Sequence, residues 1–393
     1  MLRILRIADV PNNRTSGMSR AMYGTGNVLI SVGHQVDYLF TSHLHAWGAA
    51  VLRRFTVPLI LPFHVRNLIR QGQQYDVVEV HEPLAAPYCF LRKFFMSLPP
   101  IVVFSHGLEE RSRIAELQYR KKKGLSISLK KRYFPMSVVL QAIYGTRHSN
   151  HVICLNSEDF QHLSLSGVPE GRLTRLPNGV EEELLAAGQA AGSEHGPRSG
   201  ILFVGSWLIR KGILDLVPAI TQVLHRHPEL GFTAAGSGVD VETVKQDFPK
   251  NVQNQVSVIQ SFSGNEALID LYRRHSIFVL PSYFEGHPLV MTEAAAFGMA
   301  IVTTGICGMA DFIQDGRNGL LVNVGDPLSL ENGLERLIAD TELARSLGEA
   351  ARLTAHEHTW ARSAQITLQA YEKAICNASL PADDGRTRRS AKS

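Results

Sequence analysis

Residues 277–298 read IFVLPSYFEGHPLVMTEAAAFG, which is an apolar run, a short polar loop and a second apolar segment. The run Ile277–Leu280 is typical of a buried β-strand, and the segment from Leu289 to Ala296 is typical of a helix. Glu285 and Gly286 lie in the loop between them. This order of strand, loop and helix is typical of α/β folds, in which loops at the carboxyl ends of parallel strands form the ligand site.

The same alternation extends along the chain and divides it into two similar halves. Short apolar runs followed by longer helical stretches predict parallel sheets flanked by helices. We expect strands at residues 2–8, 36–40, 77–80, 101–104 and 152–155, and again at 200–204, 231–235, 256–259, 277–280 and 300–303. The predicted fold class is therefore α/β, with two doubly wound units.

Length and composition agree with two globular domains. A chain of 393 residues exceeds one ordinary core, and 45% apolar against 19% charged residues excludes a mainly disordered, collagen-like or coiled-coil protein. Small and polar residues at 186–199 predict the boundary. We expect an N-terminal domain at 1–187, a linker at 188–199, a C-terminal domain at 200–365, a helix at 366–380 and a disordered tail at 381–393.

These features predict a soluble cytoplasmic protein. The four cysteines show neither a C-x-x-C pair nor zinc-ligand spacing, which favours a reducing compartment. Arg3, Arg6 and Asp9 interrupt the apolar N-terminal run, which is therefore not typical of a signal peptide. The uncharged run Ala294–Ala310 contains three glycines, so no membrane span is predicted there.

Charge is unevenly distributed between the halves. Residues 1–197 carry a net charge of +7, and residues 198–393 carry −3. The segment Arg111–Arg132 holds nine basic residues against one acid, Glu116. This segment is either a solvated helix face or a peripheral contact with an anionic membrane surface. No nucleic-acid motif accompanies the charge, so nucleic acid is not an expected partner.

The loop in 277–298 has the chemistry of a phosphate site. A helix that begins near Leu289 exposes unpaired N–H groups and a partial positive charge, and Gly286 lets an anion approach the backbone. Glu285 and Glu293 would repel phosphate, so their expected partners are hydroxyls of a sugar and of a ribose, respectively. The alternative is a solvated loop acid at 285 and a charge that complements the helix dipole at 293.

Residues 201–220, ILFVGSWLIRKGILDLVPAI, form a second strand, loop and helix. Arg210 and Lys211 lie before the helix, at the carboxyl end of the strand. A cation at this place neutralises charge that grows on a departing diphosphate, and Lys211 is the first candidate. The alternative is a pair of exposed basic residues without a ligand.

Further motifs surround these two segments. They are SGMSRAMYGTGNVLISVGHQV at 16–36, CLNSEDF at 154–160, RLPNGV at 175–180, AAGSG at 234–238, EALIDLY at 266–272 and DGRNGLLVNVGDP at 315–327. Together with the E-x7-E pattern of Glu285 and Glu293, they make the chain resemble glycosyltransferase family 4, the glycosyl transferases group 1. The resemblance spans about residues 1–365 and is sparse between 44 and 101. It implies a GT-B fold, with two facing Rossmann-like domains, an interdomain cleft and a C-terminal helix.

The resemblance implies a role for each matching residue. The expected catalytic residues are Lys211 at the diphosphate, Glu285 at the transferred sugar and His106 beside that sugar. His81 and Glu82 are expected on the acceptor side, with Glu82 as a candidate base. The expected donor-binding residues are Gly17, Arg210, Gly236, Gly238, Phe262, Gly286, Pro288, Leu289, Val290 and Glu293.

The activity that the resemblance implies is retaining transfer of a hexosyl group. The donor is a nucleotide-sugar, UDP- or GDP-linked, and the acceptor is a hydroxyl of a lipid-linked, polysaccharide or other glycan. The leaving phosphate takes the acceptor proton, so neither a metal nor a cofactor is expected. Ser206 departs from the family pattern, which has an arginine there, and Arg210 is the candidate replacement. Two alternatives stay open: a nucleotide-sugar-binding member without catalysis, and an epimerase-type enzyme on the same fold.

Overall fold

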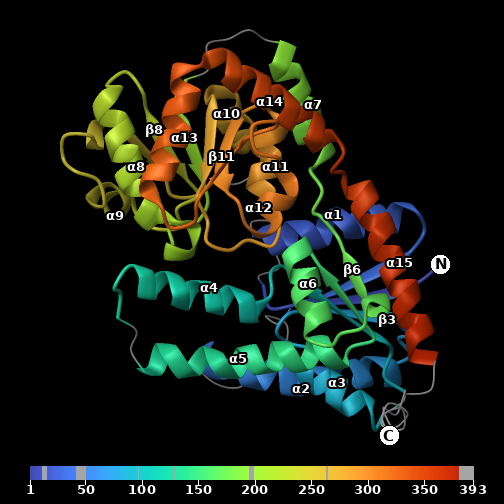
Figure 1. Cartoon of the computed structure of the whole chain (residues 1–393). Helices are drawn as coiled ribbons and strands as arrows, with labels where there is room; N and C mark the ends of the chain where they lie inside the picture. Colours follow the sequence, from blue (N-terminus) through green and yellow to red (C-terminus); the bar gives the residue numbers. More distant parts are fainter. Residues whose placement is uncertain are drawn as a thin grey trace, which may run out of the picture.

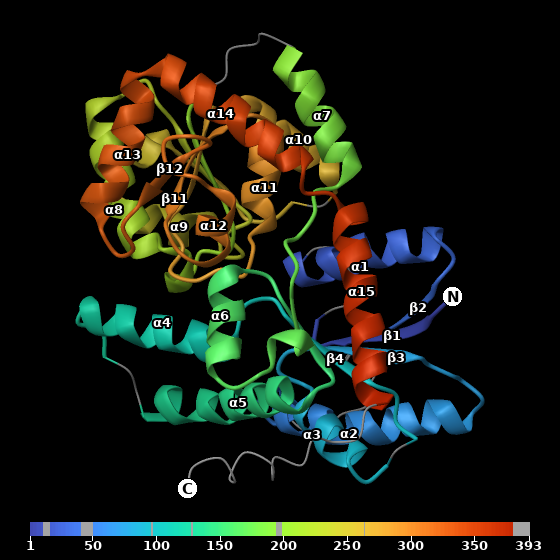
Figure 2. The ribbon, with the colours of Figure 1, turned by 45° about the vertical axis from the view of Figure 1, so that its right-hand side comes forward.

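The computed structural model describes residues 1–10, 16–40, 50–95, 97–126, 129–193, 199–262 and 264–379. These residues form two α/β halves, one above the other in Figure 1 and Figure 2. Each half contains a six-stranded parallel sheet with helices on both faces. The predicted fold class is confirmed.

The N-terminal sheet has the strand order β2-β1-β3-β4-β5-β6. Its strands are β1 (Arg3–Ala8), β2 (Gln35–Phe40), β3 (Val77–His81), β4 (Ile101–Ser105), β5 (His151–Cys154) and β6 (Leu173–Arg175). The helices of this half are α1 (Gly17–Ser31), α2 (Ala50–Arg70), α3 (Ala86–Arg92), α4 (Glu109–Lys122), α5 (Leu129–His148), α6 (Ser157–Leu165) and the short η2 (Glu170–Arg172).

The C-terminal sheet has the order β12-β11-β10-β7-β8-β9. Its strands are β7 (Ile201–Val204), β8 (Phe232–Ala235), β9 (Val256–Ile259), β10 (Ile277–Leu280), β11 (Ala300–Thr304) and β12 (Leu320–Val322). The helices that follow the linker region are η3 (Ile209–Lys211), α8 (Ile213–Arg226), α9 (Val241–Gln246), η4 (Gln253–Gln255), α10 (Asn265–Arg274), α11 (Leu289–Ala296), α12 (Cys307–Phe312), α13 (Pro327–Ala339) and α14 (Thr341–His356).

All ten expected strands are present, within one residue at either end. The sequence missed β6 and β12, which have three residues each and lie at the edges of their sheets. A run of three residues is too short to show a strand period. The other two edge strands, β2 and β9, are longer and were expected, so it is the short length of β6 and β12 that hid them.

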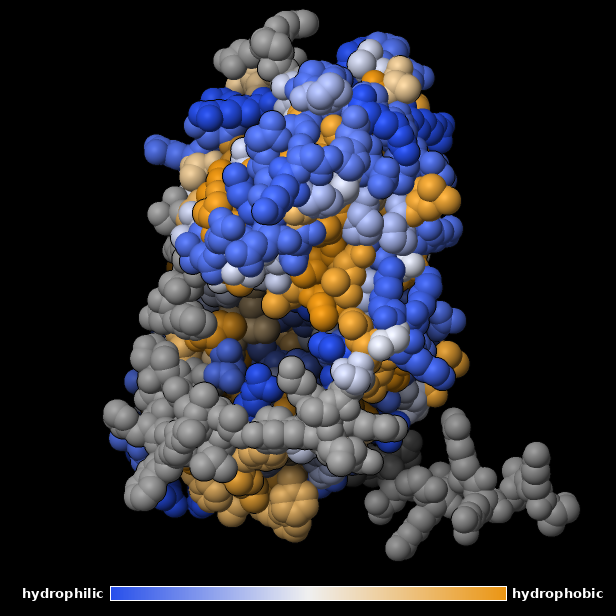
Figure 3. All heavy atoms as spheres, turned by 90° about the vertical axis from the view of Figure 1, so that its left-hand side faces the viewer, coloured by the Kyte–Doolittle hydropathy of each residue, from blue (hydrophilic) through white to orange (hydrophobic). Residues whose placement is uncertain are grey.

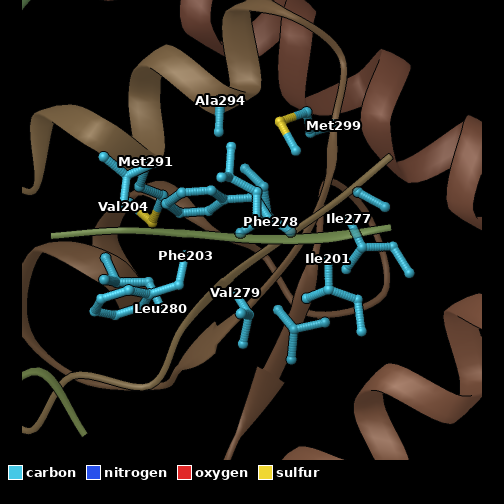
Figure 4. Packing of buried hydrophobic residues seen from close by; sticks show 14 of the residues in the cluster. Ile201, Phe203, Val204, Ile277, Phe278, Val279, Leu280, Met291, Ala294 and Met299 are labelled. Carbon is cyan, nitrogen blue, oxygen red and sulfur yellow. The ribbon is translucent and has the colours of Figure 1, made fainter. Parts of the chain in front are cut away.

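The apolar run at residues 277–280 forms the central strand β10 because both of its faces are covered. Its four side chains are at most 5% exposed, and Figure 4 shows them packed among residues of β7 and α11. Helices cover both faces of a parallel sheet, so its strands read as continuous apolar runs. The same core includes Ile201, Phe203, Val204, Met291, Ala294 and Met299.

The boundary between the halves lies earlier than predicted. Residues 188–193 of the expected linker belong to helix α7 (Glu182–Ser193), and residues 194–198 lie outside the described residues. Leu184 and Leu185 of α7 are buried in the C-terminal core. This helix therefore belongs with the second half, because its apolar side chains are covered there and not in the first.

The chain returns to the N-terminal half through α15 (Trp360–Ser379), which begins six residues earlier than the predicted helix at 366–380. Ala370, Tyr371 and Ala374 pack against the N-terminal sheet. The two segments that connect the halves, at Val180 and at His358, lie side by side: the N–H of Val180 donates to the His358 carbonyl at 2.8 Å. The expected tail at 381–393 lies outside the described residues.

Most of the described basic side chains in Arg111–Arg132 have partners within the chain, and the contact of this segment with an anionic membrane stays a prediction. Arg111 bonds Asp159 at 2.6 Å, and Lys123 reaches Asp215 of the other half at 2.6 Å. Further partners hold Arg113, Arg120 and Lys122. The side chains of residues 130–132 lie outside the described residues. Among the described helices, none has the length and apolar composition needed to cross a membrane.

Candidate active site

A cavity of about 790 Å³ lies between the two halves, at the carboxyl ends of both sheets. This is the place where loops of doubly wound sheets gather their ligand-binding residues. Most of the residues predicted from the sequence line its wall: Gly17, Glu82, His106, Arg210, Lys211, Gly236, Gly238, Phe262, Glu285, Gly286, Pro288, Leu289 and Val290.

Two helix N-termini face this cavity from opposite halves. Helix α11 begins at Leu289 after Pro288, and no side chain caps its first turn. Helix α1 begins at Gly17, where a Cβ atom would lie 3.9 Å from the side chain of Leu289. The Ser16 side chain caps the Ser19 N–H of α1, whereas the first turn of α11 keeps its N–H groups free of a side-chain cap. The positive ends of both helices make this part of the wall suitable for a diphosphate.

Glu285 lies between two cations on the wall of the cavity. Its Oε1 atom is 2.7 Å from the Lys211 ammonium and 3.1 Å from the Arg210 guanidinium. Burial raises the pKa of this carboxyl, but Lys211 and Arg210 outweigh burial and hold the pKa below its usual range. Glu285 is therefore ionised at neutral pH, and Arg210 supplies a second cation beside Lys211, although Ser206 occupies the usual arginine position.

The structure shows a second reason why residue 286 is a glycine. A Cβ atom at this residue would lie 2.0 Å from the carbonyl oxygen of His106, which belongs to the other half. The side chain of Asn156 also donates to the Gly286 carbonyl across the boundary, at 3.1 Å. Gly286 is thus required for close contact between the halves, in addition to any approach of an anion.

A hydrogen-bonded chain of buried groups leads from the N-terminal sheet to His106. Glu79 and His81 point to the same face of β3 because they are two residues apart. The Glu79 carboxylate is 3.0 Å from Nε2 of His81, and Nδ1 of His81 is 2.7 Å from Nε2 of His106. Arg6 and Tyr371 hold Glu79 from the other side, at 3.2 and 2.6 Å.

Burial and the neighbouring groups set the protonation of His106. Burial raises the pKa of Glu79, but Arg6 lowers it to about 2, so Glu79 is an acceptor at neutral pH. His81 is hydrogen-bonded to Glu79 through Nε2 and to His106 through Nδ1. Burial, and next the neighbouring His81, lower the pKa of His106 well below its usual value. His106 is therefore neutral, with one ring nitrogen that donates a hydrogen bond and one that accepts.

Glu293, predicted to bind ribose, does not line this cavity in the structure. It is 1% exposed, and its two oxygens bond Arg20 at 2.6 Å and the Tyr272 hydroxyl at 2.9 Å. Arg20 lies on α1, and it lines the cavity in place of Glu293. The ribose contact of Glu293 stays a prediction that requires Arg20 to move or to share the carboxylate.

The two residues predicted on the acceptor side differ in their surroundings. His81 is buried behind His106 and does not line the cavity, because its ring nitrogens bond Glu79 and His106. Glu82 does line the cavity, and burial raises its pKa to about 8. A carboxyl whose pKa is raised toward the operating pH can accept a proton in a reaction, so Glu82 stays a candidate base.

Several cavity residues were missed by sequence reasoning. Asn178 lies in the quoted RLPNGV motif, and its side chain donates to the His287 carbonyl at 2.9 Å. The motif gave a signal for Asn178, and the quoted stretches 16–36 and 277–298 contain Arg20 and His287, whereas no quoted motif contains Glu109, Ser112 or Gln260. The other missed residues include Arg20, Glu109, Ser112, Gln260 and His287. In the part of the chain that the structure describes, no group of three or more His, Cys, Asp or Glu residues is arranged to hold a metal.

Comparison with known families accounts for both halves. Residues 15–184 match the model of Glycosyltransferase Family 4, and residues 192–354 match that of Glycosyl transferases group 1. The chain belongs to glycosyltransferase family 4. The recognition from the sequence motifs is confirmed.

Curated relatives of this family 4 chain match it at modest identity. An uncharacterized glycosyltransferase of Methanocaldococcus jannaschii is 26% identical over 63% of this chain and 65% of its own length. A D-inositol 3-phosphate glycosyltransferase of Corynebacterium jeikeium is 29% identical over 44% of this chain and 42% of its own length. The matched region thus spans less than two thirds of these relatives.

Solved structures with the same architecture cover nearly the whole chain. A sucrose-phosphate synthase from Thermosynechococcus elongatus superimposes with a TM-score of 0.74 at 19% identity, over 96% of this chain and 100% of that one. HepE from Anabaena, in complex with UDP and glucose, superimposes with a TM-score of 0.68 at 14% identity, over 95% of this chain and 100% of that one. At these identities the likeness establishes the fold, which is GT-B.

Proposed function

We propose that this protein is a retaining glycosyltransferase that moves a hexosyl group from a nucleotide-sugar to a hydroxyl of a glycan or lipid-linked acceptor. The observation that carries the proposal is the pairing of Lys211 and Arg210 with Glu285, in the same cavity as the N-termini of α1 and α11. Two cations and two helix ends suit a diphosphate, while one carboxylate suits sugar hydroxyls. The complex of Anabaena HepE with UDP and glucose supports UDP as the first nucleotide to test, with GDP as the second.

Donor binding uses groups that already face the cavity. The Lys211 ammonium has three N–H donors and spends one on Glu285, so it retains donors for phosphate oxygens. Amides at the start of α11 add uncharged donors. Glu285, held ionised, accepts hydrogen bonds from the sugar, and the neutral ring of His106 forms another with the same sugar. These contacts orient the anomeric carbon toward the N-terminal half.

In the transfer step, the bond from the anomeric carbon to the phosphate oxygen breaks while a bond to the acceptor oxygen forms on the same face. The acceptor proton passes to the leaving phosphate oxygen, so no strong protein base is needed. Charge on the diphosphate increases in this step, and Lys211 and Arg210 stabilise it most when it is largest. The neutral His106 adds no positive charge that would oppose an oxocarbenium-like sugar.

The arrangement of Arg210 favours catalysis over the non-catalytic alternative. Ser206 removes one expected cation, but the Arg210 guanidinium lines the cavity and contacts the same carboxylate oxygen as Lys211. The cation count at the site is thereby restored. No observation in the structure favours an epimerase-type reaction.

The proposal is tested with a panel of nucleotide-sugars. A donor that binds the native state raises the melting temperature, so the panel identifies the base and the sugar. The selected donor is then incubated with acceptor extracts, and the anomeric configuration of the product is read by NMR. Transfer with retention supports the proposal. Stabilisation without turnover supports a non-catalytic member, release of an altered nucleotide-sugar supports an epimerase, and inversion refutes the mechanism.

We place this activity at the cytoplasmic face of a membrane, with the protein attached peripherally. The reduced cysteines, Cys89, Cys154 and Cys307, are buried and unpaired, which is compatible with a reducing compartment. The segment Arg111–Arg132 was the first candidate for this contact. Its described basic side chains are largely paired within the chain, so a second surface is also a candidate for this contact.

A further inference from the structure

Helices α2, α3 and α5 form the underside of the N-terminal half, and this face exposes large apolar side chains. Six such side chains are between 47 and 67% exposed. They occur as pairs four residues apart, two on α2, two at α3 and two on α5, and residues four apart share one side of a helix. The pairs are Leu59 and Phe63, Phe90 and Phe94, and Met136 and Leu140. We call this surface the underside face.

The three pairs belong to one continuous surface. Helix α3 contacts both α2 and α5, the three lie together at the base of the molecule in Figure 1, and side chains join them. The Arg66 guanidinium on α2 lies 4.6 Å from the Phe95 ring, and Lys93 reaches the Tyr144 hydroxyl of α5 at 3.3 Å. In Figure 3, apolar side chains gather at the lower end of the molecule, where these helices lie.

The sequence that builds the underside face contains no acidic residue. Residues 38–75, 83–108 and 117–157 are free of Asp and Glu, and they include all of α2, α3 and α5. Cations accompany the apolar side chains on these elements: Arg70 and Lys93 are exposed, and Arg66 packs on Phe95. Arg54 and Arg147 lie near Glu109 and Glu110 of α4 and are not counted with this face. The surface is therefore apolar and basic together, with no carboxylate of its own helices to neutralise it.

We propose that the underside face docks on an anionic lipid bilayer. Aromatic and aliphatic side chains enter the boundary between headgroups and acyl chains, and the cations meet anionic headgroups. A second copy of this chain is a poorer occupant, because pairing two such faces sets cations against cations with no acid to offset them. The charge of the face thus favours lipid over self-association.

This inference rests on the proposed function where it concerns the acceptor. Helix α5 packs against α4, and Glu109 and Ser112 of α4 line the cavity. A protein held on a bilayer by α2, α3 and α5 therefore presents its acceptor half to the membrane, which suits a lipid-linked acceptor. Binding to lipid itself requires no sugar transfer.

The test is sedimentation of the full chain with phosphatidylcholine vesicles, with and without phosphatidylglycerol. We expect binding only to the anionic vesicles, and weaker binding at high salt. The triple variant Phe63→Glu, Phe94→Glu, Leu140→Glu should lower the affinity about a hundredfold, since each change removes an apolar contact and adds a repelled charge. The single variant Phe94→Glu, at the most exposed of the six, should give a smaller loss in the same direction.

The matched control carries Leu328→Glu and Leu353→Glu, which are 62 and 59% exposed on the C-terminal half. This variant should bind vesicles nearly as well as the unaltered chain. Equal binding by the triple variant, or no binding by the unaltered chain, overturns the proposal. A dimeric unaltered chain together with a monomeric triple variant also overturns the proposal, because the face would then be an interface between copies.

Donor binding separates a failure of this inference from a failure of the proposed function. A donor that raises the melting temperature of the triple variant as much as that of the unaltered chain shows an intact fold and cavity. Lost vesicle binding with retained donor binding then supports the underside face. Vesicle binding in a protein that no nucleotide-sugar stabilises would refute the proposed function alone.

Discussion

Replacing Lys211 by methionine removes the cation that contacts Glu285 and leaves the volume of the side chain nearly unchanged. Lys211 is 13% exposed on its side chain and lies 2.7 Å from the Glu285 carboxylate, so water screens it little. A charge-assisted hydrogen bond to phosphate contributes about 1.5–3 kcal/mol. The donor dissociation constant should therefore rise about 10- to 150-fold, since 1.36 kcal/mol corresponds to a factor of ten.

The catalytic rate should fall further than the affinity. The diphosphate gains charge as it leaves, so a cation contributes more to the transition state than to the bound donor. Loss of one preorganised group of this kind lowers kcat about 100- to 1,000-fold. A merely structural lysine would lower stability and leave the kcat of the folded fraction unchanged.

The pH profile gives an independent readout of Lys211→Met. Burial raises the pKa of Glu285 and the two cations lower it, with Lys211 the larger of the two. When Lys211 is removed, burial is opposed by Arg210 alone and the pKa rises. Glu285 is ionised above its pKa, so the acid limb of kcat/KM should move to higher pH. An unmoved limb would mean that Glu285 does not act as a carboxylate in the reaction.

The assay is steady-state transfer over a range of donor concentration and pH, with calorimetry for donor binding. Lys250→Met, an exposed lysine of the same half, is the matched control and should change neither quantity. Donor affinity and kcat within about twofold of the unaltered enzyme for Lys211→Met would refute the assignment, because a phosphate contact is worth about tenfold or more.

Three further variants test the buried contacts around the cavity. The pKa of Glu79 is about 2 against an ordinary 4.5, so its ionisation contributes about 3 kcal/mol of stability that is present above pH 4.5 and lost as pH falls toward 2. Urea unfolding should show that Glu79→Gln lowers stability at pH 7, and that the difference from the unaltered chain shrinks across this interval. Gly286→Ala should lower kcat about a hundredfold in the transfer assay, because its methyl group would lie 2.0 Å from the His106 carbonyl and displace one half from the other. Arg20→Met leaves Glu293 buried with the Tyr272 hydroxyl alone, and urea unfolding should show a loss of about 3–5 kcal/mol.

Each of these variants has a contradicting outcome. A stability difference for Glu79→Gln that stays constant between pH 4.5 and 2 would mean that Glu79 keeps an ordinary pKa. Gly171→Ala, where an added Cβ meets nothing within 4 Å, is the control for Gly286 and should leave kcat unchanged. Arg345→Met, which breaks an exposed pair with Glu342, should alter stability by less than about 1 kcal/mol. If Arg20→Met lowers stability only as much as Arg345→Met does, the contact between Arg20 and Glu293 does not act as a buried ion pair.

The fold followed from local pattern because each buried strand carries its own signal. Apolar runs such as 101–104 and 277–280 are buried on both faces by helices, and this burial is visible as four consecutive apolar residues. The sequence also predicted which loops, at the carboxyl ends of these strands, contribute residues to the ligand site. Lys211, Glu285 and Gly286 lie in the cavity where the strand order predicted them.

Partnerships across the boundary were decided by tertiary structure alone. Arg20 and Glu293 are 273 positions apart, and no spacing rule connects them. The same holds for Tyr371, which returns from the last helix to hold Glu79 and so supports His106. A strand or helix is specified by neighbours along the chain, whereas an ion pair between halves depends on how two finished domains meet.

Charge shows the same division between local and tertiary information. The excess of basic residues in the N-terminal half is a property of composition, and the sequence is sufficient to state it. Which cations remain available to a partner is a property of packing. Folding pairs Arg111 and Lys123 with Asp159 and Asp215, and it leaves the acid-free helices α2, α3 and α5 facing outward. An ionic side chain acts on what lies within a few ångströms, and only the folded chain determines those distances.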